Sequence, residues 1–532
     1  MTDTLQAAES YEIISEADRI ESPLRVLKHG DSFGVFDQHG DIVAGEGGAQ
    51  GFYYNDTRFL ARLEVAIASR RPLLLSSSVT DDNTVFTVDL TNPEIRRGET
   101  PVVARGQIHV FRSIVLCNGS AYQRVRVSNY GLEPVELPFT VSFDSDFADL
   151  FEVRGTRRTA RGTIGPVTIG LSSAILSYRG LDNVERKTRI EWNRRPESLE
   201  AGVAVFMLEL GPKASTTLDM TVTCEISQAA SDSVRLPLGH DEAVSETLSQ
   251  SIEWRAGGCR VSTNSESFNR WLARSEADLE MMITQTPHGR YPYAGVPWFS
   301  TVFGRDGIIT AMELLWAQPT LAEGVLSFLA ATQATRVSDA QDAQPGKILH
   351  ELRGGEMAAL GEVPFARYYG SIDATPLFVI LAAAYYQRTA DHTVMNRIWP
   401  NVCAAVEWME STVTSTATAS SSTRAGLQRV WCSRDGRTRT TRCSTKMGRW
   451  PRRRSRCARC RPTRTARGSA PRNLRGSAAR SIWRRNGGSA PRCCAAGSTT
   501  RSGATRSART RWRSMDRSAR AASARRTLHT AC

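Results

Sequence analysis

The chain has 532 residues, of which 68 are Lys or Arg and 54 are Asp or Glu, giving a formal net charge of +14. Since one hydrophobic core rarely serves more than roughly 250–300 residues, at least two domains are expected. Residues 411–532 hold 31 of the basic side chains and two of the acidic ones, so residues 1–410 carry a net charge of −15. This acidic body argues against a nucleic-acid-binding surface there.

The number of cysteines and the N-terminal sequence indicate in which cellular compartment the protein is expected. Residues 1–410 contain four scattered cysteines, Cys117, Cys224, Cys259 and Cys403, a usage typical of a reduced cytosolic protein. Residues 1–23 are polar and acidic at the start, and no run of about 18 apolar residues occurs in the chain. We therefore expect a cytoplasmic protein with a disordered N-terminus and no membrane span.

Residues 24–228 predict a β-sandwich. Apolar and polar residues alternate there, and turn residues recur about every ten positions. The runs Gln107–Leu116 and Ala121–Ser128 flank Asn118-Gly119, a dipeptide that tolerates the positive φ angles of a tight hairpin turn. Val135–Phe143 alternates again. Strands of this length need a facing sheet to bury one side, which favours a sandwich.

Residues 229–410 show helical periodicity. Asn264 and Ser265 can cap a helix whose mostly apolar stripe comprises Phe268, Trp271, Leu272, Ser275, Leu279 and Met282. Further helices are expected at Gly307–Ala317, Thr320–Thr335, Ala374–Asp391 and Thr393–Glu410. Helices joined by long polar loops, with no strand between them, indicate a helical barrel or toroid with its chemistry in the loops at one end.

Three loops combine aromatic and polar residues directly before these helices. The densest contains Trp298, Arg305 and Asp306, whose side chains could stack on a sugar ring and pair with its hydroxyls. The alternative is a structural Arg–Asp pair with Trp298 in the core. The other loops contain His350-Glu351 and Tyr369 to Asp373. Asp373 has the alternative role of a helix cap, and no second His at helical spacing accompanies His350, which argues against zinc.

Five segments together resemble the bacterial glycogen-debranching, amylo-α-1,6-glucosidase-like family. In the expected sandwich they are G-F-Y-Y-N-D-T-R-F-L at 51–60 and D-F-A-D-L-F-E-V-R-G at 146–155, which we interpret as turn and domain-interface residues. In the helical part they are P-W-F-S-T-V-F-G-R-D, P-G-K-I-L-H-E-L-R-G-G-E-M and Y-Y-G-S-I-D-A-T-P-L-F. The resemblance implies an N-terminal β-sandwich followed by the opening part of an (α/α)6 toroid at 229–410.

The resemblance also implies the activity, which is hydrolysis of α-1,6-linked glucose at branch points of glycogen, limit dextrin or related α-glucans, with no cofactor and no metal. Trp298, Arg305, Asp306, Glu351, Tyr369 and Asp373 would contact the substrate. One carboxyl group would protonate the leaving oxygen and a second would activate water, the two standing roughly 6.5–9.5 Å apart in an inverting enzyme. The family's acid lies in a later Q-G-W-K-D-S motif, which this chain does not contain as written.

Residues 411–532 have the composition of a frameshifted tail. Lys446 is the only lysine among their 31 basic residues, and Arg, Ser, Thr, Ala and Cys dominate, as expected of GC-rich codons read out of frame. In the intended frame, each codon would consist of the last base of one written codon and the first two bases of the next. Under this rule, the codons of residues 433–448 can encode Q-G-W-K-D-S-Y-D-A-V-F-H-E-D-G. As written, the tail lacks the apolar residues needed to offset ordering entropy, so we predict disorder and an inactive chain.

Two other functions fit parts of the sequence. A non-catalytic carbohydrate-binding protein would use the sandwich and the loop of Trp298 to Asp306. A nucleic-acid partner would use the Arg-rich tail, although lysine is almost missing there and no aromatic residues interleave on a folded module.

Overall fold

The computed structural model describes residues 24–45, 48–97, 100–227 and 238–418, and these residues belong to one compact unit. The predictions for residues 1–23 and for most of the tail lie outside them. Helix α8 continues to Thr418, so the backbone is helical beyond the predicted boundary at residue 410. A formed helix extends at little cost where no Gly or Pro interrupts it, and residues 411–418 contain neither.

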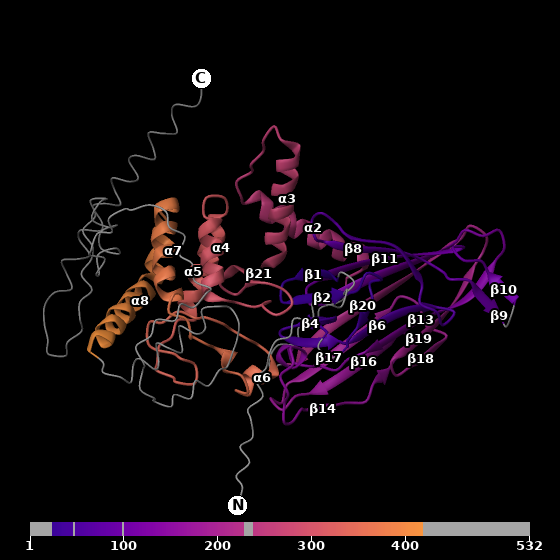
Figure 1. Cartoon of the computed structure of the whole chain (residues 1–532), viewed down its shortest axis with the longest axis horizontal. Coiled ribbons are helices and arrows are strands. Elements are labelled where there is room, and N and C mark those ends of the chain that lie inside the picture. Colours follow the sequence, from indigo (N-terminus) through magenta and orange to yellow (C-terminus); the bar gives the residue numbers. More distant parts are fainter. Residues whose placement is uncertain (1–23, 46–47, 98–99, 228–237, 419–532) are drawn as a thin grey trace, which may run out of the picture. The chain divides into compact units, whose positions relative to one another are not determined.

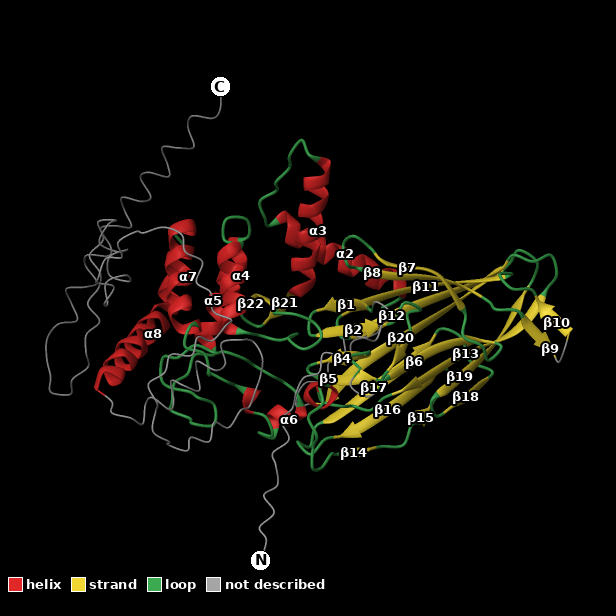
Figure 2. Ribbon diagram, viewed as in Figure 1, coloured by secondary structure: helices red, strands yellow, loops and turns green. Residues whose placement is uncertain are grey.

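The predicted β-sandwich is confirmed (Figure 2). Its strands pair antiparallel in sheets of order β14-β16-β17-β20-β12-β11-β8-β7, with β15 beside β16, and β18-β19-β13-β6-β3. A smaller sheet has the order β1-β2-β4-β5. One hydrophobic core joins these sheets, and Phe86, Phe139 and Phe206 are fully buried in it. Burial of each such side chain contributes about 1.5–3 kcal/mol.

The strands of the largest sheet are β7 Leu73–Val79, β8 Val85–Thr91, β11 Ile108–Cys117, β12 Ser120–Asn129, β14 Thr163–Ile164, β15 Thr168–Ile169, β16 Ser173–Arg179, β17 Glu185–Trp192 and β20 Ser215–Ser227. Those of the facing sheet are β3 Ile42–Val43, β6 Arg62–Ile67, β13 Val135–Asp144, β18 Ser198–Glu200 and β19 Val203–Leu210. The smaller sheet contains β1 Arg25–His29, β2 Ser32–Phe36, β4 Gly51–Tyr54 and β5 Thr57–Leu60. Two separate hairpins are β9 Ile95–Arg97 with β10 Thr100–Val103, and β21 Ile283–Thr286 with β22 Gly289–Pro292.

Two tight turns show why the sandwich follows the sequence pattern. Asn118 and Gly119 have φ angles of 50° and 81° and join β11 to β12, as predicted. Asn55 and Asp56 have φ angles of 45° and 60° and join β4 to β5. Asn, Asp and Gly are the residues that accept such angles at least cost. The second turn places the Asp56 carboxylate at the end of its hairpin, outside the sheet.

The described helices are α1 Leu150–Val153, α2 His240–Ala256, α3 Glu266–Met282, α4 Gly304–Glu313, α5 Pro319–Ala331, α6 Glu356–Ala359, α7 Ala374–Thr389 and α8 His392–Thr418, with a 3-10 turn at Pro364–Ala366. In the second half of the chain, α4, α5, α7 and α8 pack on one another around their own core (Figure 1). The predicted order of a sandwich followed by a helical region is therefore confirmed. None of the described helices combines the length and apolar character that crossing a bilayer requires.

The helical region departs from prediction in three places. Helix α2 was not predicted, because its sequence has little apolar periodicity and only His240, Ala243, Ser251 and Trp254 are buried. The hairpin of β21 and β22 follows α3, where no strand was expected. Helix α4 begins at Gly304, three residues before the predicted start at Gly307, which puts Asp306 in its first turn, where a carboxylate is favourable.

Helix α3 begins as predicted, but its apolar stripe lies on the surface. The Ser265 hydroxyl accepts a hydrogen bond from the Phe268 backbone N–H at 3.4 Å. Phe268, Trp271 and Leu279 remain 42%, 62% and 36% exposed. Amphipathic periodicity predicts that a helix has an apolar face, and it does not specify which element covers that face.

Candidate functional site

Backbone hydrogen bonds hold the three motif loops side by side. Phe303 forms a β-bridge with Glu351, and Glu351 forms a second one with Tyr368. The Gly304 N–H donates to the His350 carbonyl at 2.9 Å, and the His350 N–H donates to the Tyr368 carbonyl at 2.7 Å. The starts of α4 and α7 are thereby brought to the same place, as the sequence predicted for loops that converge.

A group of four side chains, which we call the polar rim, lies at this place and consists of Arg305, Asp306, His350 and Asp373. Arg305 Nη1 lies 3.2 Å from Asp373 Oδ2, and Arg305 Nε lies 3.9 Å from Asp306 Oδ2. The side chains of Arg305, Asp306 and Asp373 are 43%, 40% and 41% exposed. The pairing therefore leaves these groups open to a bound molecule.

Two atoms of the polar rim have unused hydrogen-bonding capacity. Oδ1 of Asp373 and Nδ1 of His350 are buried without a partner among the described residues. Burial, together with the charge of Arg305, lowers the pKa of His350, while Asp306 and Asp373 act in the opposite direction. A neutral imidazole can donate or accept a hydrogen bond, and a carboxylate oxygen accepts one. The sequence predicts no substrate contact for His350 and suggests it only as a metal ligand. Its neighbours in the polar rim come from other loops, which local sequence does not show.

Asp373 occupies the N-cap position of α7 but does not act as its cap. Its side chain makes no capping hydrogen bond, and the Ser371 hydroxyl accepts from the Ala374 N–H at 3.4 Å instead. The carboxylate of Asp373 is engaged by Arg305. The alternative role of Asp373 as a simple helix cap is therefore not supported by the geometry.

Trp298, Glu351 and Tyr369 have packed surroundings and take no part in the ion pairs of the polar rim. The Tyr369 hydroxyl donates to the Thr332 carbonyl at 2.7 Å, and the residue is 4% exposed. Glu351 is 7% exposed and accepts from Arg353 Nε at 2.8 Å. Trp298 is half-buried against the cluster that contains Phe33 and Tyr53. Their substrate contacts therefore stay predictions, and packing is the role that their positions support.

Arg353 connects the motif loops to the sandwich. Its side chain is 1% exposed, and its nitrogens donate to Glu351 at 2.8 Å, to Asp56 Oδ1 at 2.9 Å and to the Trp298 carbonyl at 2.8 Å. Asp56 Oδ2 also accepts from the Gly354 N–H at 2.9 Å. A turn in segment 51–60 thus binds the loop that carries His350 and Glu351, which confirms the predicted interface role of that segment.

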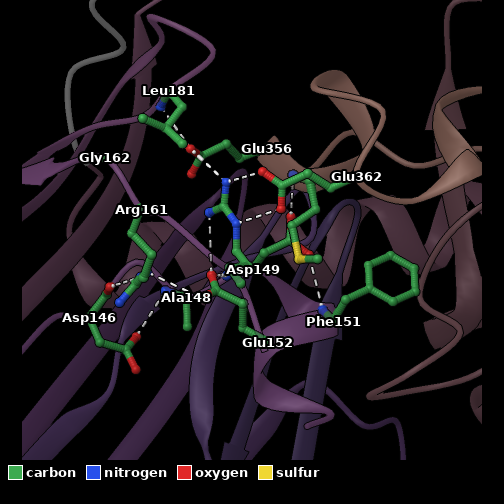
Figure 3. A network of polar contacts seen from close by, with 12 residues as sticks. Asp146, Ala148, Asp149, Phe151, Glu152, Arg161, Gly162, Leu181, Glu356 and Glu362 are labelled. Carbon is green, nitrogen blue, oxygen red and sulfur yellow. Dashed lines mark hydrogen bonds and ion pairs between the residues drawn. The ribbon is translucent and has the colours of Figure 1, made fainter. Parts of the chain in front are cut away.

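The second interface segment, 146–155, lies in the polar network of Figure 3. Asp149 caps α1 through Oδ1 and accepts from the Met357 N–H through Oδ2 at 3.0 Å. Arg158 lies 3.1 Å from Glu356 and 2.7 Å from Glu362, and its side chain is 1% exposed. Burial raises the pKa of Asp149 to about 6, against the effect of its two backbone donors. These contacts join the sandwich to α6.

A buried lysine of strand β1, Lys28, gives a pH prediction. Lys28 Nζ donates to the Gly30 carbonyl at 2.7 Å and to Thr284 Oγ1 at 2.9 Å, and burial lowers its pKa to about 7 from 10.5, against the attraction of Asp31. Between these two values the unfolded chain keeps a proton that the folded chain has lost, so the free energy of unfolding should rise with pH.

Urea unfolding at pH 7, 8 and 9 should show a smaller rise for Lys28→Met than for the unmodified chain. The exposed Lys213 supplies the control, because Lys213→Met should leave the pH dependence unchanged. Equal slopes for Lys28→Met and the unmodified chain would contradict the assignment to Lys28.

No group of three or more His, Cys, Asp or Glu side chains within the described ranges could hold a metal ion. The polar rim itself consists of a guanidinium, two carboxylates and an imidazole. This set can donate to and accept from several neighbouring hydroxyls at once.

Comparison with a family model finds a match over residues 27–221, to the N-terminal domain of some glycogen debranching enzymes. A search of curated proteins finds no match.

Among solved structures, a human-microbiome protein described as a candidate kojibiose phosphorylase has 10% identity and a TM-score of 0.48, covering 72% of this chain and 56% of its own. A bacterial glucoamylase complexed with acarbose has 12% identity and a TM-score of 0.36, covering 69% of this chain and 59% of its own. A candidate aldose 1-epimerase from Escherichia coli K12 has 10% identity and a TM-score of 0.21, covering 38% of this chain and 99% of its own. The chain thus spans a little over half of the first two proteins.

Proposed function

We propose that the chain binds α-glucans and derives from an amylo-α-1,6-glucosidase-like hydrolase, because residues 27–221 match the model of the N-terminal domain of some glycogen debranching enzymes. Its substrate class would be branched glucans such as glycogen and limit dextrin, from which that enzyme removes the α-1,6-linked glucose. Cys224 and Cys259 are free thiols, which supports a cytoplasmic location.

The polar rim is the observation that carries the glucan-binding part of the proposal. A sugar presents adjacent hydroxyls that each donate and accept, and recognition needs both kinds of partner close together. Arg305 supplies donors, while the partly exposed carboxylates of Asp306 and Asp373 supply acceptors. Phe299 is 40% exposed, and its ring lies 5.8 Å from that of Phe303 between ring centroids. An exposed aromatic ring offers a face for the apolar side of a sugar.

The polypeptide as written is proposed to bind glucan without hydrolysing it. The proposed catalytic acid would come from the shifted frame, which restores Q-G-W-K-D-S at residues 433–448, and the base would lie later in the same frame. Within the described residues, the two carboxylates of the polar rim both face Arg305 as ion-pair partners. An ion-paired carboxylate does not offer the proton that the leaving oxygen needs. Non-catalytic carbohydrate binding is thus the second function that a specific observation favours.

No structural observation favours nucleic-acid binding, because almost all of the Arg-rich tail lies outside the described residues.

Asp373→Asn tests the rim. The substitution keeps the shape of the side chain and removes its charge, so Arg305 loses its closest partner and the sugar loses a charged acceptor. A hydrogen bond to a charged group contributes about 1.5–3 kcal/mol, so the dissociation constant for maltotriose should rise about 10- to 100-fold in isothermal titration calorimetry.

The matched control is Asp81→Asn, which alters an exposed carboxylate on the sandwich. It should bind maltotriose as the unmodified chain does. If Asp373→Asn also binds unchanged, the polar rim is not the glucan site.

A further inference from the structure

A partly open cavity has a lining that shares no residue with the polar rim. It has a volume of about 300 Å³ and is lined by the sandwich residues Asp31 and Asn55, by Tyr293 after β22, by Ser300 and Val302 from the loop before α4, and by Phe328 of α5. We call it the junction cavity. This volume is at the lower end of the range for small-molecule sites and is larger than one or two buried waters need.

The junction cavity has hydrogen-bonding groups that the protein leaves unused. Ser300 is 8% exposed, yet its hydroxyl has no partner among the described residues. The Tyr293 hydroxyl donates to Asp31 Oδ1 at 2.5 Å, and this is the one hydrogen bond found for the Asp31 carboxylate in the described part of the chain. A buried hydroxyl without a partner costs free energy, so a bound group or water is expected to satisfy Ser300.

The walls limit the chemistry of a ligand. The rings of Tyr293 and Phe328 and the side chain of Val302 form apolar surface. Arg353, the cation in the lining, is already bound by Asp56 and Glu351, and the buried Lys28 is attracted to Asp31. An anion would therefore meet the carboxylates of Asp31 and Asp56 and cations that already have carboxylate partners, which disfavours its binding. A divalent cation lacks the necessary ligands, because no three carboxylate or imidazole groups converge in the described residues. Apolar faces with several hydroxyl and carboxylate partners suit an uncharged polyol.

We propose that the junction cavity is a second carbohydrate subsite that accepts one uncharged, hexose-sized polyol independently of the polar rim. Residues from the sandwich and from the helical region both line it, so the bound sugar would hold the two together. Ligand binding to a site that exists only in the folded chain raises the free energy of unfolding.

The test uses glucose as the probe on the full chain in an Asp373→Asn background, where the polar rim is weakened. Calorimetry should still detect glucose binding there, and adding Ser300→Val should weaken it at least tenfold, because the substitution removes the hydroxyl and narrows the cavity. Ser300→Ala removes only the unpaired hydroxyl, leaves folding intact, and should weaken binding about 2- to 10-fold. If Ser300→Val fails to fold, Ser300→Ala decides the question.

Two outcomes overturn the junction subsite. In the first, Asp373→Asn shows no glucose binding; in the second, binding persists unchanged in both Ser300 variants. Maltotriose separates this inference from the proposed function, since a chain of three sugars is too large for the junction cavity. If Asp373→Asn loses maltotriose binding and Ser300→Ala leaves glucose binding unchanged, the junction subsite is refuted and the proposed function stands. If Asp373→Asn binds maltotriose unchanged, the polar rim is refuted as the glucan site, and the junction subsite is not affected.

Discussion

The purified 532-residue chain should release no glucose from limit dextrin, whereas the product of the gene corrected for frame after residue 410 should do so. General acid and general base groups each contribute about 10²- to 10⁴-fold to such reactions, so the difference in rate should be at least on the order of 10⁴. The measurement is a glucose-release assay on both proteins at equal concentration. The difference is expected because the proposed acid and base would be encoded only in the corrected frame, whereas the rim carboxylates that pair with Arg305 are common to both proteins.

The control for this result is maltotriose binding, which both proteins should share because the polar rim is the same in each. Turnover by the uncorrected chain would refute the claim that its catalytic groups are missing. A gene with no open alternative phase after codon 410 would refute the frameshift itself.

Replacing Arg353 by Met should destabilise the fold by about 3–5 kcal/mol, because it leaves Asp56 and Glu351 buried without a compensating charge. The side chain is 1% exposed and stands between the two carboxylates, so water cannot replace it. The burial of Glu351 already raises the pKa of its carboxyl, in opposition to Arg353. Urea unfolding followed by circular dichroism measures the change.

The matched control is Arg397→Met. Arg397 lies 3.6 Å from Glu323, and both side chains are largely exposed, so its loss should cost no more than about 1 kcal/mol. If the two variants lost similar amounts of stability, the ion pairs of Arg353 would contribute no more than an exposed surface ion pair does.

Much of the fold could be predicted because the sandwich obeys local rules. The alternation of strands such as β17, and the Asn118-Gly119 turn, follow from side-chain direction and backbone sterics alone. Helix α2 and the hairpin of β21 and β22 were missed because their positions depend on neighbours far away in the chain. Thr284 of the hairpin, for example, is held by Lys28.

The candidate site was predicted in part for the same reason. Arg305, Asp306 and Asp373 do meet, since each stands at a helix start. Local sequence could not reveal that Glu351 faces Arg353. The position of the Arg353 side chain depends on Asp56, which is 297 residues away in the chain. Local sequence also could not reveal that His350 joins the rim.

The turn between β4 and β5 constrains how this protein can evolve. Asp56 exists at the tip of a sandwich hairpin, but its partners, Arg353 and the Gly354 N–H, come from the helical half. A recombination event that fused this sandwich to an unrelated catalytic domain would place a bare carboxylate against a foreign surface. A substitution at Asp56 should therefore destabilise the contact between the two halves, because it leaves the buried Arg353 guanidinium with one carboxylate partner fewer.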